Sequence, residues 1–381
     1  MNFNQLNEEY SSIKEPSLFG RYITNSNIEK CIEKLDKAKV AIIGYSVEKK
    51  PIYAFIYGSG SKKILLWSQM HGNESTTTKA LFDCFNVFEL DTDLSRTILE
   101  SCTLYIIPIL NPDGAEVYTR VNANDIDLNR DAQYLSQPES KVLRSVFDEF
   151  KPDYCFNLHG QRTIFGVGYS GKSASMSFLS PSQDKERTVT VNRKVAMSII
   201  SDLNKTMQEV IPNSVGRYDD GFNLNCVGDM FQSLGVPTIL YEAGHIDGDY
   251  NREEIRKVVF IALLKGLSVI SNGIIDSNSH EYFEIPENTK SFYDIIIRNA
   301  KTETNAKELV DIAIQYKEIL INGSITFKPN IASISNLEKY YGHKEYDVQG
   351  KIVKSDQKIP LKVSCEIDFV LIKNEKISLK P

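Results

Sequence analysis

Short apolar runs alternate with helical segments through the first 270 residues, and this alternation limits the possible folds more than any other feature. The apolar runs at 40–46, 52–57, 64–67, 102–110, 155–158 and 236–241 are predicted strands. The segments at 76–87, 139–150, 191–209 and 253–270 have apolar residues at helical spacing. Nearly continuous apolar runs are typical of strands that are buried on both faces of a sheet. The pattern therefore predicts an α/β fold with a mixed central sheet.

The character of the chain changes after about residue 278, where short β-rich runs replace the alternation. These runs lie at 291–297, 319–327, 346–353 and 367–373. A chain of 381 residues also exceeds the usual size of one compact core. We therefore expect a first domain at 1–278 and a smaller β-rich C-terminal domain, of unknown role, at 279–381. His280 and His343 fall in this second part and are interpreted as surface histidines.

Composition excludes several classes of function. A formal net charge of −6 argues against nucleic acid as a main partner, because phosphate binding needs a basic surface. No stretch has the roughly 18 apolar residues of a membrane span, and the N-terminus has no apolar leader, so we expect a cytoplasmic protein without membrane contact. The scattered cysteines are interpreted as reduced, packed thiols; they are Cys31, Cys84, Cys102, Cys155, Cys226 and Cys365.

A candidate metal-binding motif, His71-Gly72-Asn73-Glu74, directly follows the apolar run at 64–67. An imidazole and a carboxylate held three residues apart can bind one zinc ion. The plainer alternative is a turn, capped by the Ser/Thr run at 75–78, whose His and Glu face water. The motif gains weight only if other strand ends supply a third ligand, a base and cations.

A second strand end leads into two arginines. Asn111-Pro112-Asp113-Gly114 is an ordinary turn signal, and Arg120 and Arg130 follow it in a polar loop. One guanidinium can grip a substrate carboxylate while the other neutralises a developing oxyanion. The alternative is that both arginines form surface ion pairs with acids of the same loop, namely Asp125, Asp127 or Asp131.

Two further strand ends offer a third ligand and a base. His159 follows the run at 155–158 and would complete a His₂Glu set with one position open for water. Glu242 ends the run at 236–241 and can act as the general base on that water. His245 competes with His159 as the third ligand, but it lies three residues after the proposed base, and we favour His159.

These motifs together resemble the zinc carboxypeptidase family, including bacterial cytoplasmic members such as murein peptide amidases. The resemblance covers about residues 35–272 and includes a further family-like stretch at Gln137-Pro138-Glu139-Ser140. The motifs occur in the family's order: His-Gly-Asn-Glu at 71–74, Asn-Pro-Asp-Gly at 111–114, Arg120 with Asn122, Asp127-Leu128-Asn129-Arg130, His159 and Glu242.

The resemblance implies a mostly parallel central sheet flanked by helices, and it assigns roles to single residues. It implies that His71, Glu74 and His159 bind one zinc ion, that Glu242 promotes water attack and that Arg120 polarises the scissile carbonyl. Substrate-binding roles fall to Asn129 and Arg130, which would hold a terminal carboxylate, and to Tyr218, the nearest counterpart of the family's mobile tyrosine. The alternative for Tyr218, with equal weight, is an ordinary loop aromatic. The chain differs from the classic members at Asn73, where they carry an arginine; many bacterial members resemble this chain there.

The leading hypothesis is a zinc metallopeptidase that hydrolyses a C-terminal or near-terminal bond of a peptide or murein peptide. One rival is an amidohydrolase of N-acyl amino acids that resembles aspartoacylase or succinylglutamate desuccinylase. Another rival is a non-catalytic protein that binds peptides through Arg120 and Arg130. Side-chain preference and oligomeric state do not follow from the sequence.

Overall fold

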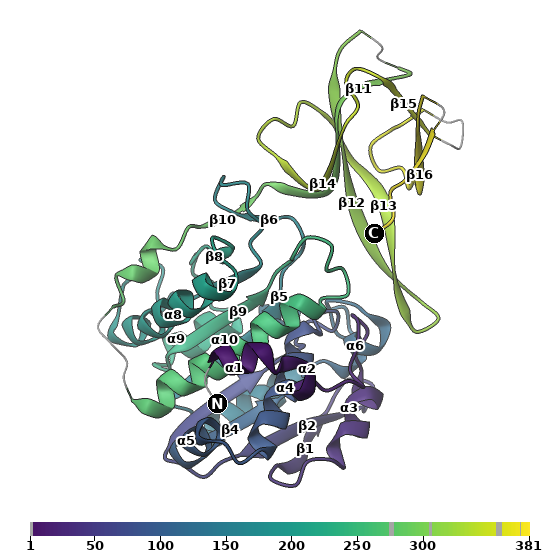
Figure 1. The fold of residues 1–381 in the computed structure, drawn as a ribbon. Helices are drawn as coiled ribbons and strands as arrows, with labels where there is room; N and C mark the ends of the chain where they lie inside the picture. Colours follow the sequence, from purple (N-terminus) through teal and green to yellow (C-terminus); the bar gives the residue numbers. More distant parts are fainter. Residues whose placement is uncertain (1–2, 274–277, 305–306, 356–359, 374) are drawn as a thin grey trace.

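A computed structural model describes residues 3–273, 278–304, 307–355, 360–373 and 375–381. Within these ranges the chain forms an eight-stranded sheet with helices on both faces and a second sheet built from the C-terminal part. The second sheet stands beside one end of the first body, and a long hairpin reaches back toward it (Figure 1). The predicted α/β architecture with a smaller β-rich part is confirmed.

The central sheet has the strand order β1-β2-β4-β3-β5-β9-β7-β8. Its middle strands β4, β3, β5 and β9 are parallel neighbours, whereas β1, β2 and β7 join by antiparallel pairing. The sheet is therefore mixed, with a parallel centre. The strands are β1 (Lys39–Tyr45), β2 (Pro51–Tyr57), β3 (Lys62–Trp67), β4 (Cys102–Ile107), β5 (Tyr154–Gly160), β7 (Met176–Leu179), β8 (Val215–Arg217) and β9 (Thr238–Ala243).

This topology places the four sequence motifs at the carboxyl ends of the central parallel strands. Because β4, β3, β5 and β9 run in the same direction, their carboxyl ends meet, and one motif lies at or just after the end of each strand. Ligands of open α/β sheets bind at such carboxyl ends. The strands themselves are apolar because helices cover both of their faces; Ile64 to Trp67, for example, are buried.

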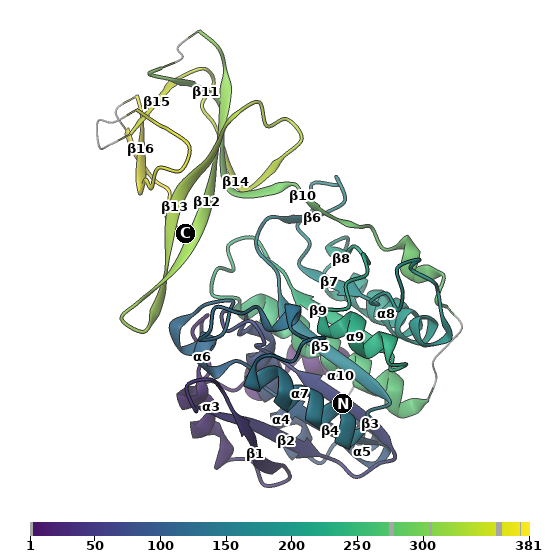
Figure 2. The same cartoon turned by 180° about the vertical axis from the view of Figure 1, so that it is seen from behind.

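Helices cover the two faces of the sheet in separate layers. Residues of α4, α8 and α10 join one core cluster, and residues of α7 and α9 join another on the opposite face (Figures 1 and 2). The helices are α1 (Phe3–Glu8), α2 (Tyr10–Ile13), α3 (Asn25–Ile32), α4 (Thr76–Glu89), α5 (Asp93–Ser101), α6 (Pro112–Val117), α7 (Pro138–Phe150), α8 (Val191–Val210), α9 (Val227–Ser233) and α10 (Glu253–Asn272), with short 3₁₀ turns η1 (Leu128–Arg130) and η2 (Glu281–Glu284). No helix in the described part of the chain is long and apolar enough to cross a membrane.

The C-terminal sheet begins after β10 (Asn288–Lys290), which pairs with β6 (Phe165–Val167) of the first body. Its strands are β11 (Phe292–Thr302), β12 (Val310–Ile321), β13 (Ser324–Ser335), β14 (Tyr341–Asp347), β15 (Ile352–Ser355), β16 (Phe369–Ile372) and β17 (Glu375–Ser378). The predicted run at 319–327 is two strands, because Asn322 and Gly323 adopt positive φ and form a tight hairpin turn. The run at 346–353 likewise divides between β14 and β15. A domain division at 278/279 stays a prediction.

His343 contradicts the expectation of a surface histidine. Its side chain is only 2% exposed, because β14 carries it against the first body. There its Nδ1 lies 2.8 Å from Asp247 Oδ1, and its Nε2 lies 2.7 Å from the carbonyl oxygen of Thr163. His280 is exposed, as expected. All the cysteines are unpaired, and four of them are buried, which agrees with packed thiols.

Candidate metal centre and its cavity

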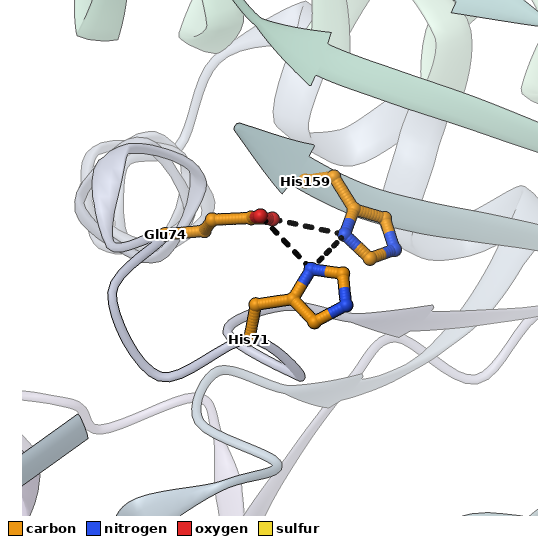
Figure 3. Close-up of side chains that lie close together, drawn as sticks. All are labelled: His71, Glu74 and His159. Carbon is orange, nitrogen blue, oxygen red and sulfur yellow. Dashed lines mark hydrogen bonds and ion pairs between the residues drawn. The ribbon is translucent and has the colours of Figure 1, made fainter. Parts of the chain in front are cut away.

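The candidate ligands converge because of the order of the parallel strands. β3 lies beside β5, and β5 lies beside β9, with His159 directly opposite Glu242 in the register. His71 and Glu74 follow in the turn between β3 and α4, so they approach His159 from the neighbouring strand end (Figure 3). Residues far apart in sequence therefore meet at the carboxyl ends of neighbouring central strands.

The donor atoms of three side chains face one another at this point (Figure 3). His71 Nδ1 lies 2.9 Å from Glu74 Oε1, His159 Nδ1 lies 2.9 Å from Glu74 Oε2, and the two Nδ1 atoms are 3.1 Å apart. Tetrahedral zinc, with bonds of about 2.0–2.2 Å, separates its ligand atoms by about 3.3–3.5 Å. The donor set and its spacing therefore fit zinc after a small outward movement. Burial opposes the charge of Glu74, yet the two imidazoles hold the pKa of its carboxyl well below the ordinary range.

Asp127 fixes the orientation of His71. The Nε2 atom of His71 lies 3.1 Å from Asp127 Oδ1, which also accepts a hydrogen bond from the backbone N–H of Asn129 at 2.9 Å. A carboxylate on the far nitrogen selects the tautomer whose Nδ1 lone pair is free for a metal. The sequence analysis places Asp127 in a family-like motif but gives it no role beyond that of a possible ion-pair partner of an arginine. The sequence signal that could have pointed to Asp127 is its position in the Asp127-Leu128-Asn129-Arg130 motif.

The glycines of two motifs allow two turns to touch. A Cβ atom on Gly72 would lie 2.0 Å from the carbonyl carbon of Gly114, so neither a side chain nor a shift is easily accommodated there. Asn111 holds the second turn in place, since its Nδ2 donates to the carbonyl oxygen of Met70 at 3.2 Å and its Oδ1 accepts from Gly114 N at 2.9 Å. The Asn-Pro-Asp-Gly turn therefore supports the turn that carries His71.

The loop that follows carries the two candidate arginines. Arg120 lies with Nη1 3.3 Å from Glu74 Oε1 and Nε 3.0 Å from Asp127 Oδ2, and 46% of its side chain is exposed. The alternative of a surface ion pair between Arg120 and an acid of its own loop is therefore correct for Asp127, but Arg120 also contacts Glu74. Arg130 forms no ion pair with any described residue; its Nη1 donates to the carbonyl oxygen of Asn129. The Gln137-Pro138-Glu139-Ser140 stretch anchors the loop, because Gln137 and Glu139 accept hydrogen bonds from the side chain of Asn122.

Glu242 projects beside the ligands without a hydrogen-bond partner. Its Oε2 is buried and unpaired among the described residues. Burial, and then the nearby Glu74 carboxylate, raise the pKa of Glu242 well above its ordinary value. His245, the rival third ligand, lies elsewhere: its ring packs 4.8 Å from the Tyr250 ring and 4.5 Å from the His343 ring. The group of ligand atoms therefore contains His159 and not His245.

A cavity of about 440 Å³ opens over the candidate metal centre. It brings together every residue that the sequence singled out for the site, and the Tyr218 ring within it packs 5.4 Å from the Phe165 ring. These residues are His71, Glu74, Arg120, Asn129, Arg130, His159, Tyr218 and Glu242. A cavity of this size is typical of small-ligand sites.

Sequence reasoning missed other residues of the cavity wall, among them Asp229 on α9. Asp229 is 7% exposed and accepts a hydrogen bond from the backbone N–H of Asn223 at 3.3 Å. Burial raises the pKa of Asp229 to about 7, although that N–H and Arg130 act in the opposite direction. Asp229 belongs to no recognisable motif. The sequence signal that could have pointed to it is a single acidic residue among the apolar residues of a short helix.

Comparisons with known proteins agree with this geometry. The family model for zinc carboxypeptidases matches residues 28–255. The chain is 26% identical to carboxypeptidase SOL1 of Arabidopsis thaliana over 223 residues, which is 52% of this chain and 45% of that protein. It is 23% identical to carboxypeptidase E of Caenorhabditis elegans over 242 residues, which is 53% of this chain and 49% of that protein. The chain therefore spans about half the length of these curated relatives.

A solved metallo-carboxypeptidase from Burkholderia cenocepacia shares the fold. It superposes with a TM-score of 0.53 at 17% identity, covering 66% of this chain and 70% of that chain. The C-terminal sheet begins beyond the residues that the family model matches.

Proposed function

The chain belongs to the zinc carboxypeptidase family, and from that premise we propose that it is a zinc-dependent peptidase that removes a residue from, or near, the C-terminus of a peptide. The observation that carries the proposal is the convergence of the His71, Glu74 and His159 donor atoms in one cavity with Glu242 and two arginines. A protein that only binds peptides would need neither the three candidate zinc ligands nor Glu242. A hydrolase needs all of them.

His71, Glu74 and His159 are the residues that would hold the zinc ion. When bound in such a site, zinc supplies Lewis-acid polarisation of a carbonyl oxygen and lowers the pKa of water to about 7. Asp127 keeps the His71 ring in the orientation that this requires. The chain's own residues perform the remaining steps.

Glu242 is the proposed general base. It lies opposite His159 in the register, and its unpaired Oε2 is available to accept a proton from the attacking water and to return it to the leaving amine. Arg120 is the proposed partner of the oxyanion, because its half-exposed guanidinium lies beside Glu74 at the same point of the cavity.

Asn129, Arg130 and Tyr218 are the proposed binding residues for the substrate's terminal carboxylate. Arg130 lines the cavity without a carboxylate partner among the described residues, so its guanidinium is available to an incoming carboxylate. Asn129 also lines the cavity; its side-chain oxygen accepts from Val227 N at 2.9 Å, so its amide N–H₂ is the part of the side chain proposed to bind the substrate. Tyr218 covers the same space from the strand end of β8.

Turnover by a Glu242→Gln variant tests the proposal. The zinc-loaded wild-type protein should hydrolyse C-terminal residues from a panel that includes basic, acidic, aromatic and diaminopimelate-containing peptides. The Glu242→Gln variant should bind zinc equally but lose at least about 100-fold in kcat, because a general base contributes about 10²–10⁴. An equally active variant would overturn the role of Glu242.

The same panel separates the rivals of the peptidase. Hydrolysis of N-acyl amino acids with no hydrolysis of peptides would point to an amidohydrolase. A purified protein that holds no zinc, and gains no activity when zinc is added, would point to a binding protein. Metal analysis and chelator controls accompany each measurement.

A further inference from the structure

A second cavity, of about 290 Å³, adjoins the candidate metal centre. Glu74, Arg120 and Arg162 line both this cavity and the main one, so the two spaces meet at the metal centre. Asn129 and Arg130 line only the main cavity. The second space therefore adjoins the metal centre but does not include the proposed site for the terminal carboxylate.

The C-terminal part of the chain builds the outer wall of the second cavity. Tyr316 and Glu318, both on β12, line it together with Arg21 and Tyr118 of the first body. Arg21 Nη2 lies 2.7 Å from Glu318 Oε2, and the Tyr118 hydroxyl donates to the same carboxylate. These contacts attach the β12–β13 hairpin beside the site (Figure 1).

Buried contacts behind the wall hold it in position. The Tyr316 ring packs 5.1 Å from the Tyr250 ring, and its hydroxyl donates to the carbonyl oxygen of Leu379 at 2.7 Å. Asp294, which is buried, accepts hydrogen bonds from Tyr316 N at 2.7 Å and from the Tyr250 hydroxyl at 3.1 Å. The wall is therefore part of the packed structure of the molecule.

The charges around the second cavity leave one cation without a partner. Glu318 compensates Arg21, while Glu74 and Asp127 compensate Arg120. Arg162 is exposed in the loop after β5 and makes no hydrogen bond or ion pair with any residue that the structure describes. A ligand that carries a carboxylate would supply the missing charge.

We infer that the second cavity binds the residue on the acyl side of the cleaved bond, and that Arg162 selects an acidic side chain there. This inference rests on the proposed peptidase function, because the substrate must extend from Arg130, past the metal centre, into the second cavity. The C-terminal part of the chain is then a wall of the substrate site. A volume of about 290 Å³, at the lower end of ligand pockets, suits one side chain with its backbone.

Matched peptides test the inference. N-acetyl dipeptides with one C-terminal residue and Glu, Gln or Lys on the acyl side isolate the charge, since Glu and Gln have nearly the same shape. The wild-type protein should show kcat/KM about tenfold higher for Glu than for Gln. Arg162→Gln should reduce this ratio to near one, Arg162→Lys should keep part of it, and Arg162→Glu should favour Lys.

A control and a binding measurement make the outcomes distinct. Arg96→Gln removes an exposed arginine on α5, outside both cavities, and should keep the wild-type ratio. Calorimetry with the zinc-loaded Glu242→Gln protein should give the same order of affinities without turnover. Active wild-type protein whose Glu/Gln ratio is unchanged in Arg162→Gln overturns the inference alone. Absence of hydrolysis by wild-type protein overturns the proposed function, and the affinities then decide the role of Arg162.

Discussion

Asp127 contacts the ring nitrogen of His71 that points away from the candidate metal centre, with 3.1 Å between Nε2 and Oδ1. Loss of this carboxylate should weaken zinc binding, because such partners orient a histidine ligand and their removal costs about 10–100-fold in metal affinity. We expect that loss for Asp127→Asn. Competition with a coloured chelator measures it. Asp125→Asn, an exposed change in the same loop, is the control; equal affinities in both variants would contradict the role of Asp127.

Gly72→Ala should destabilise the protein and disturb its metal centre. The added methyl group would collide with the backbone of Gly114 at 2.0 Å, and backbone cannot move aside cheaply. We expect a loss of roughly 2 kcal/mol or more in the free energy of unfolding, measured with urea, and weaker zinc binding. Gly160→Ala is the matched control, since its methyl group would make only ordinary contacts, with the Glu74 side chain at 3.6 Å and the Ala243 carbonyl oxygen at 3.7 Å. Equal stability of the two variants would refute the close packing of the turns.

Asp229 should make stability depend on pH. Burial raises its pKa from 3.8 to about 7, so the folded protein keeps a proton that the unfolded chain has already lost. Stability from this group is therefore complete below about pH 4 and falls as the pH rises through about 7. At about 1.4 kcal/mol per pK unit the loss can reach roughly 4 kcal/mol.

Asp229→Asn removes that dependence while keeping an oxygen for the Asn223 N–H. The free energy of unfolding of the wild-type protein, relative to the variant, should fall between pH 4 and pH 7 and then level off. Urea unfolding at several pH values measures the difference. Asp219→Asn, at a side chain that is 76% exposed, should leave the wild-type pH dependence unchanged. Parallel curves for wild-type protein and Asp229→Asn would contradict the prediction.

The central sheet and the ligand set could be predicted because their signals are local. Each strand of the parallel centre is a short apolar run, and each motif follows its run directly, as His159 follows the strand residues at 155–158. The rule that ligands lie at carboxyl ends of parallel strands then joins motifs that are far apart in sequence. The order of the strands and the two short strands β7 and β8 were left for the structure to give.

The remaining features depend on contacts between distant parts of the chain. Arg21 and Glu318 are 297 positions apart, and nothing near either residue points to the other. His343 was interpreted as exposed because its burial depends on docking against Thr163. The Asn322-Gly323 turn was a local signal, but the apolar residues on either side concealed it within one predicted strand.

The position of Tyr316 in the second cavity also bears on how the molecule is synthesised. The ribosome has added all three candidate metal ligands once it passes residue 159, and the proposed base once it passes residue 242. Tyr316 emerges much later, and its hydroxyl is fixed by the carbonyl oxygen of Leu379. A nascent chain therefore passes through a stage in which the proposed residues for hydrolysis are present while the wall that Tyr316 contributes is absent. Completion of the last strands supplies that wall.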